Sequence, residues 1–132
     1  LLLLTTASAA ANSTGTILVV GDSLSAAYGI DQRLGWVALL RQRLMENGAD
    51  YRVVNASITG DTTRGGLTRL PAALERERPG VLVIALGGND GLRGFAPQQT
   101  YDNLARMIEL GRDFGARVLL LGVRLPENYG RA

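Results

Sequence analysis

The segment TILVVGDSLSAAYG, residues 16–29, joins an apolar run to a loop rich in glycine and serine. Residues 16–20 are almost entirely apolar, as expected for a strand that is buried on both faces of a parallel sheet. The loop then places Ser23 on a sharp turn between this strand and the helix that we expect next. Two interpretations of Ser23 are open: it is a nucleophile, or it is a cap that begins the helix.

The rest of the chain alternates between apolar runs and segments with helical periodicity. Further apolar runs occupy residues 51–54, 81–86 and 117–123. Apolar residues recur at helical spacing over residues 34–47, 62–78 and 97–114. Gly65, Gly66 and Pro71 predict that the helix over 62–78 is bent or in two pieces. The alternation predicts an α/β fold: a doubly wound, flavodoxin-like parallel sheet with helices on both faces, in three α/β/α layers.

The composition excludes several classes of site. All 14 basic residues are arginines, they are scattered along the chain, and the net charge is only +2, so we expect no nucleic-acid partner. The chain has no cysteine and no histidine, so we expect neither a disulfide nor a metal site. Its 132 residues correspond to one domain. We also expect no cofactor, no stable membrane insertion and a monomer.

The first eleven residues differ from the rest of the chain. LLLLTTASAAA, residues 1–11, resembles the end of a signal-peptide core followed by a small-residue cleavage site. The alternative is a frayed apolar tail. We therefore expect residues 1–11 to be a signal-peptide remnant, residues 12–132 to be the folded domain, and the protein to be exported to the periplasm or secreted.

Polar, glycine-rich segments follow each of the predicted strands. They are residues 21–25, 55–63, 87–91 and 124–130. Because parallel strands end at the same edge of a sheet, we expect these segments to converge on one rim. Each has a structural explanation when taken alone: Asp22, Ser23, Asp61 or Thr62 as helix caps, and residues 87–90 as a tight turn. Their convergence predicts a site but does not define its chemistry.

The residue types in these segments favour acyl transfer. A serine hydroxyl at Ser23, a backbone N–H at Gly60 and a side-chain amide at Asn89 suit a nucleophile with an oxyanion hole. A dinucleotide site would instead have the pattern G-x-G-x-x-G after the first strand, where this chain has G-D-S-L-S-A.

Four motifs together resemble those of a known family. They are GDSLSAAYG at 21–29, NASITGDTTRGGLTRLP at 55–71, LGGNDGLRG at 86–94 and RLPENYG at 124–130. In this order and at these separations they resemble SGNH (GDSL-type) hydrolases, in the branch of bacterial exported thioesterases, lysophospholipases and arylesterases.

The resemblance implies a serine esterase or thioesterase that acts on small ester, thioester or lipid substrates without a cofactor. It makes Ser23 the nucleophile and, through its own N–H, one donor of the oxyanion hole. Gly60 and Asn89 would be the other donors. Asp22 would organise the turn and not act as a catalytic acid.

One part of the family pattern is absent from this sequence. The family carries a histidine and its aspartate partner in a C-terminal D-x-x-H block, and this chain has no histidine. We therefore expect the sequence to be truncated before that block, without the last strand and helix of the fold, and to be inactive alone. Two alternatives remain: an O-acyltransferase of the same family, and a non-catalytic relative that binds lipids or glycans.

Overall fold

A computed structural model describes residues 15–124 of the protein. Within this range the strands are β1 (Gly15–Gly21), β2 (Tyr51–Asn55), β3 (Val81–Ala85) and β4 (Arg117–Leu120). The helices are α1 (Trp36–Glu46), α2 (Thr63–Glu77), α3 (Gly88–Leu92) and α4 (Pro97–Asp113), with a short 3₁₀ helix, η1 (Gln32–Leu34), before α1. The signal-peptide remnant that we predict at residues 1–11 lies outside the described residues.

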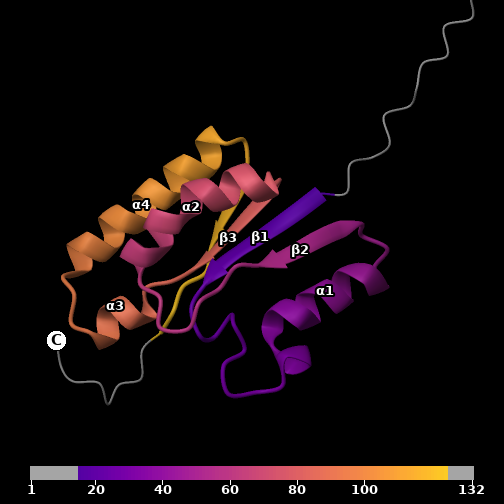
Figure 1. The fold of residues 1–132 in the computed structure, drawn as a ribbon, viewed down its shortest axis with the longest axis horizontal. Helices are drawn as coiled ribbons and strands as arrows, with labels where there is room; N and C mark the ends of the chain where they lie inside the picture. Colours follow the sequence, from indigo (N-terminus) through magenta and orange to yellow (C-terminus); the bar gives the residue numbers. More distant parts are fainter. Residues whose placement is uncertain (1–14, 125–132) are drawn as a thin grey trace, which may run out of the picture.

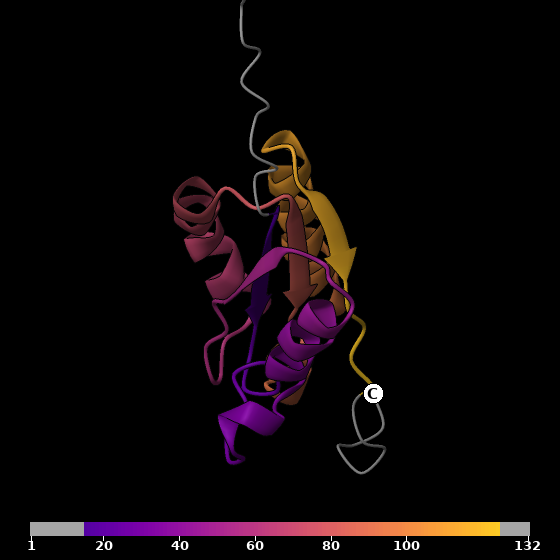
Figure 2. The same cartoon turned by 90° about the vertical axis from the view of Figure 1, so that its right-hand side faces the viewer.

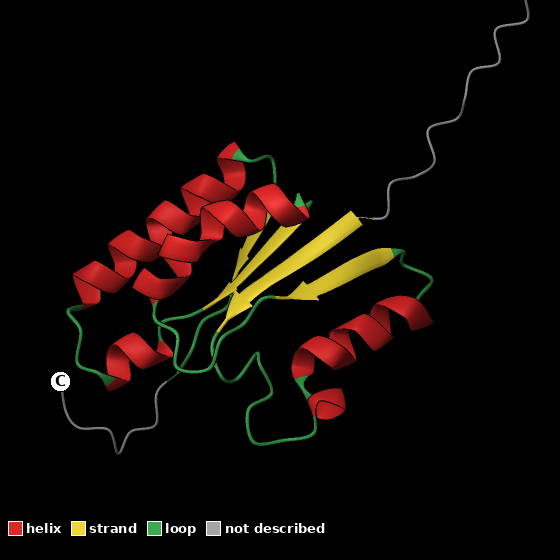
Figure 3. Ribbon diagram, in the orientation of Figure 1, coloured by secondary structure: helices red, strands yellow, loops and turns green. Residues whose placement is uncertain are grey.

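The described strands form one parallel sheet in the order β2-β1-β3-β4. Central strand β1 pairs with both neighbours, so that Leu18 lies opposite Val54 on β2 and Leu82 on β3. This arrangement confirms the predicted doubly wound parallel sheet. Because all strands point the same way, the loops that follow them gather at one end of the sheet, as Figure 3 shows.

Helices cover both faces of the sheet. Leu18 and Val20 of β1 belong to a core that includes residues of α2 and α4, whereas Ile17 and Val19 belong to a second core with Val37 of α1. Figure 1 shows α2 and α4 on one side of the strands and α1 on the other, and Figure 2 shows the same layers turned by 90°. The alternation of side chains along β1 therefore produces the predicted three layers.

Helix α2 runs without interruption from Thr63 to Glu77, so the prediction of two pieces is wrong. Pro71 lies inside the helix but is exposed, and its ring faces solvent. The side of α2 that faces the sheet carries Leu70 and Leu74, which are almost fully buried. Burial of this apolar face holds the helix together although Pro71 lacks an N–H to donate.

Helix α4 approaches the sheet closely at Gly111. A Cβ atom at this position would lie 2.8 Å from the side chains of Leu82 on β3 and Val118 on β4. Both of those residues belong to or pack against the core under α2 and α4. The absence of a side chain at Gly111 therefore sets the distance between helix and sheet.

We expect Gly111→Ala to lower the free energy of unfolding by about 1–3 kcal/mol, because the extra methyl overpacks this contact. Urea unfolding of the protein expressed from its complete reading frame measures the change. Gly80→Ala is the matched control, since a Cβ at Gly80 meets no atom within 4 Å and its φ is not positive. A Gly111→Ala protein as stable as the parent would contradict the proposed close contact.

Candidate active site

The turn that carries Ser23 is built around Asp22. Asp22 is buried, and its carboxylate Oδ1 accepts a hydrogen bond from the backbone N–H of Leu24 at 3.0 Å. Its carbonyl accepts from Ala26 N at 2.9 Å, and the Ser23 carbonyl accepts from Tyr28 N at 3.0 Å. These bonds wrap the chain around Asp22 and leave Ser23 partly exposed at the rim. Asp22 thus organises the turn.

Ser23 does not begin a helix, so the interpretation of Asp22 or Ser23 as a helix cap is wrong. Residues 23–29 form consecutive turns, and the next helix, η1, starts at Gln32 with Asp31 as its cap. Ala27 and Gly29 both have positive φ, 57° and 80°. This left-handed backbone ends the turn around Asp22 before a regular helix can form.

The loop after β2 presents Gly60 in a tight turn. Asp61 N donates to the Ile58 carbonyl at 3.1 Å, and Gly60 has a φ of 78°, the value that a type II turn requires at its third residue. Ile58 N donates to the Gly21 carbonyl at 3.0 Å. The Gly60 turn is therefore attached to the end of β1, two residues before Ser23. Thr62, and not Asp61, caps α2 through its side chain.

Asn89 joins the other two loops. Its amide Nδ2 donates to the Asp61 carbonyl at 2.8 Å and lies 3.5 Å from the Asp22 carboxylate Oδ2. Asp22 precedes Ser23 and Asp61 follows Gly60, so the structure brings all three predicted segments to one rim. In the fourth predicted segment, residues 124–130, only residue 124 belongs to the described part of the chain.

The Asn89 amide has donor capacity to spare. A side-chain amide carries two N–H groups, and the 2.8 Å bond to Asp61 uses one of them. The 3.5 Å approach to Asp22 is at the limit of a hydrogen bond. The second N–H can therefore donate to an oxygen of a bound ligand while the first keeps the side chain oriented.

Asn89 lies on α3, a short helix where the sequence predicted only a tight turn. The next residue, Asp90, is almost completely buried and holds this helix against α2. Its Oδ2 accepts from Thr63 N at 2.9 Å, and its Oδ1 accepts from the Thr63 hydroxyl. Asn103 of α4 donates to the same hydroxyl at 3.0 Å. Sequence analysis missed this network because its members lie on three separate helices.

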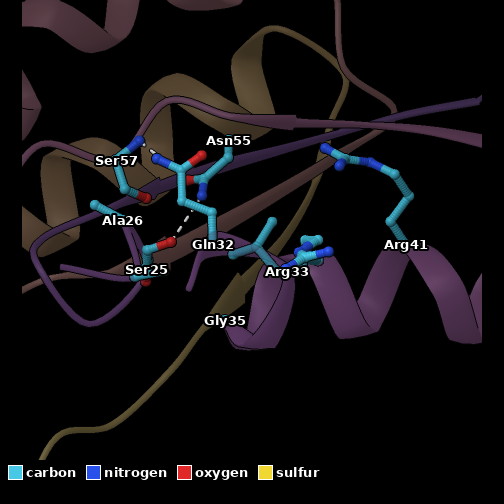
Figure 4. A pocket seen from close by; sticks show the side chains of 11 residues that line it. Ser25, Ala26, Gln32, Arg33, Gly35, Arg41, Asn55 and Ser57 are labelled. Atoms are coloured by element: carbon cyan, nitrogen blue, oxygen red, sulfur yellow. Dashed lines mark hydrogen bonds between the residues drawn. The ribbon is translucent and has the colours of Figure 1, made fainter. Parts of the chain in front are cut away.

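A cavity of about 460 Å³ lies on the α1 side of the Ser23 turn. Figure 4 shows Asn55 within it, donating to the Ser25 carbonyl at 2.7 Å and accepting from Ser57 N at 3.2 Å. Arg33 at its edge binds Asp31, and these hydrogen bonds lower the pKa of the Asp31 carboxyl. Neither Ser23 nor Asn89 lines this cavity. The cavity is therefore distinct from the rim that carries these two residues.

No group of His, Cys, Asp and Glu side chains within residues 15–124 could hold a metal ion. The three loops offer the hydroxyl of Ser23, the backbone N–H of Gly60 and the side-chain amide of Asn89. These group types suit attack on a carbonyl and stabilisation of the resulting oxyanion.

Comparisons with known proteins agree with this chemistry. The esterase TesA of Pseudomonas aeruginosa is 64% identical over 115 residues, which cover 87% of this chain and 57% of that protein. The thioesterase 1/protease 1/lysophospholipase L1 of Escherichia coli K12 is 47% identical over 131 residues, or 99% of this chain and 60% of that protein.

Comparison with solved structures also finds an esterase. The crystal structure of the psychrotrophic esterase EstA from Pseudoalteromonas sp., inhibited by monoethylphosphonate, is 43% identical with a TM-score of 0.82, over 88% of this chain and 63% of that one. The chain thus spans about three fifths of the length of these relatives. The model of the GDSL-like lipase/acylhydrolase family matches residues 19–132, and the chain belongs to this family.

Proposed function

We propose that this chain carries the nucleophile and the oxyanion hole of a serine esterase or thioesterase. The observation that supports this function most directly is the position of the Asn89 amide. It contacts Asp61 beside Gly60 and approaches Asp22 beside Ser23. An amide with one weakly engaged N–H therefore contacts the residue before Ser23 and the residue after Gly60.

In the proposed reaction, Ser23 Oγ attacks the carbonyl carbon of an ester or thioester. The negative charge that develops on the carbonyl oxygen accepts hydrogen bonds from Ser23 N–H, Gly60 N–H and Asn89 Nδ2–H. Collapse of the tetrahedral intermediate expels the alcohol or thiol and leaves an acyl group on Ser23. Water then attacks the acyl-enzyme and releases the carboxylic acid.

The base that takes the Ser23 proton must come from outside these 132 residues. The sequence has no histidine and no lysine, and arginine stays protonated. Among the carboxylates at the rim, Asp61 pairs with Arg69, while Asp22 and Asp90 are buried and accept hydrogen bonds from backbone N–H groups. None is placed to act as a strong base. We therefore propose that a histidine elsewhere in the complete protein completes the site.

Hydrolysis is favoured over acyl transfer and over a purely binding role. The three relatives described above carry the names of an esterase, of a thioesterase and lysophospholipase, and of an esterase inhibited by a phosphonate. An acyltransferase would use the same Ser23 and Asn89, so the names of the relatives favour hydrolysis over acyl transfer, and the nucleophile and donors favour catalysis over binding alone.

Substitution of Ser23 and Asn89 tests the proposal in the protein expressed from its complete reading frame. We expect Ser23→Ala to abolish both turnover of p-nitrophenyl esters and labelling by a fluorophosphonate, because no other hydroxyl replaces the nucleophile. We expect Asn89→Ala to lower kcat by about 10²–10³, the loss typical of one oxyanion donor.

Matched controls remove the same kinds of side chain from other positions. Ser57→Ala removes a buried hydroxyl that has no hydrogen-bond partner in the described structure, and Asn47→Ala removes an exposed amide at the end of α1. Both variants are expected to keep activity. Undiminished ester turnover by the Ser23→Ala protein would refute the proposed function.

We also propose that the protein is exported. The apolar run at residues 1–4 and the alanine-rich segment after it support a signal peptide. In the described part of the chain, each helix is too short or too polar to cross a bilayer. We expect N-terminal sequencing of the mature protein, isolated from its native host, to begin near residue 12. Recovery of an uncleaved N-terminus from the cytoplasmic fraction would contradict export.

A further inference from the structure

Arg69 of α2 contacts the loops of the proposed site with its guanidinium group. Its guanidinium Nε donates to Asp61 Oδ2 at 2.8 Å, Nη1 donates to the Ala56 carbonyl, and Nη2 approaches the Gly21 carbonyl at 3.4 Å. All of these partners lie more than seven residues from Arg69 in the sequence. One side chain therefore connects three acceptors that are distant from it in the sequence.

These three points define the loops that carry the proposed donors. Gly21 ends β1, two residues before Ser23. Ala56 begins the loop after β2, and Asp61 ends the turn that contains Gly60. The rigid planar fork of a guanidinium can hold several acceptors in fixed relative positions, which a lysine ammonium on a flexible stem cannot do.

The ion pair between Arg69 and Asp61 is mostly buried. The Arg69 side chain is 23% exposed and that of Asp61 is 11% exposed. Asp61 Oδ1 also accepts a hydrogen bond from Thr62 N at 3.0 Å. A Cβ atom at Gly65 would overlap the same carboxylate, so the carboxylate is packed directly against the first turn of α2. Loss of Arg69 would leave a largely buried charge without its partner and allow the turn to shift.

A shift of this turn would displace two of the three proposed oxyanion donors. Gly60 N–H belongs to the turn directly. Asn89 depends on it because its amide donates to the Asp61 carbonyl at 2.8 Å. We propose that Arg69 is a positioning residue for the oxyanion hole, an inference that rests on the proposed function. It acts through Asp61 and the Ala56 and Gly21 carbonyls, without touching the substrate.

Such a role predicts a specific kinetic effect. Substrate binding in the ground state does not need a precisely aligned oxyanion hole, whereas the transition state does. A shift of the donors by a fraction of an ångström therefore lowers kcat more than it changes KM. A residue that only stabilised the fold would instead lower the amount of folded protein, and the folded fraction would keep its kcat.

The test uses Arg69→Lys and Arg69→Gln in the protein expressed from its complete reading frame. We expect kcat for p-nitrophenyl butyrate to fall by about 10–100-fold while KM changes by less than about threefold, since the donors are displaced but not removed. The affinity for a trifluoromethyl ketone, whose adduct with Ser23 places an oxyanion in the hole, should fall by the same factor as kcat. Arg52→Gln is the control, because it breaks an ion pair with Glu77 between β2 and α2, away from the rim.

If the Arg69 variants do not fold, Asp61→Asn tests the contact between Arg69 and Asp61 from the other partner. We expect this variant to lower kcat and to leave KM unchanged. Where both fold, the double variant should lose no more than the more damaging single variant, because both changes break one contact. Arg69 and Asp61 variants that keep kcat within twofold, in a protein where Ser23→Ala is inactive, would overturn the positioning role and leave the proposed function intact. An active Ser23→Ala protein would overturn the proposed function itself.

Discussion

The site depends first on the parallel pairing of β1 with both of its neighbours. Gly21 at the end of β1 lies opposite Ala85 at the end of β3, and Val19 lies opposite Asn55 at the end of β2. This register brings the ends of all three strands to one edge. The three loops therefore meet at this edge, because the last residues of β1, β2 and β3 lie within about two residues of one another in the register of the sheet. A change of register would separate the loops even if each kept its own conformation.

Pairing of the strands brings the loops close but does not align their polar groups. That alignment comes from buried and partly buried side chains that reach across loops and helices. Asp90 ties α3 to the first turn of α2 through Thr63, and Asn89 bonds the carbonyl of Asp61. Each of these contacts joins residues 27 or more positions apart in the chain. Because buried polar groups cost free energy unless they are paired, the network favours a single arrangement of the rim.

The strands and the convergence of the loops after them were predictable from the sequence because both follow from local patterns. Apolar runs indicated the strands, and the glycine-rich segments after them indicated the rim. The helix at Asn89 was not predictable, since a five-residue helix with four polar or glycine positions has no apolar periodicity. The start of α1 at Trp36 agrees with the helical spacing over residues 34–47, whereas the absence of a helix directly after Ser23 depends on a positive φ at Ala27, a conformation that alanine does not signal. Sequence patterns describe neighbours along the chain, whereas these features depend on contacts between distant segments.

Arg69 illustrates the same limit for function. In the sequence it is one of 14 arginines, and although it lies within the motif at residues 55–71, the sequence does not indicate which groups it contacts. Two of its three acceptors are backbone carbonyls, which every residue has, so only the folded chain identifies them. An oxyanion hole made of backbone and amide N–H groups gains its effect from being aligned before the substrate arrives. Such alignment requires a rigid support for the loops, and in the proposed role the planar cation of Arg69, on a helix packed against the sheet, provides it with a single side chain.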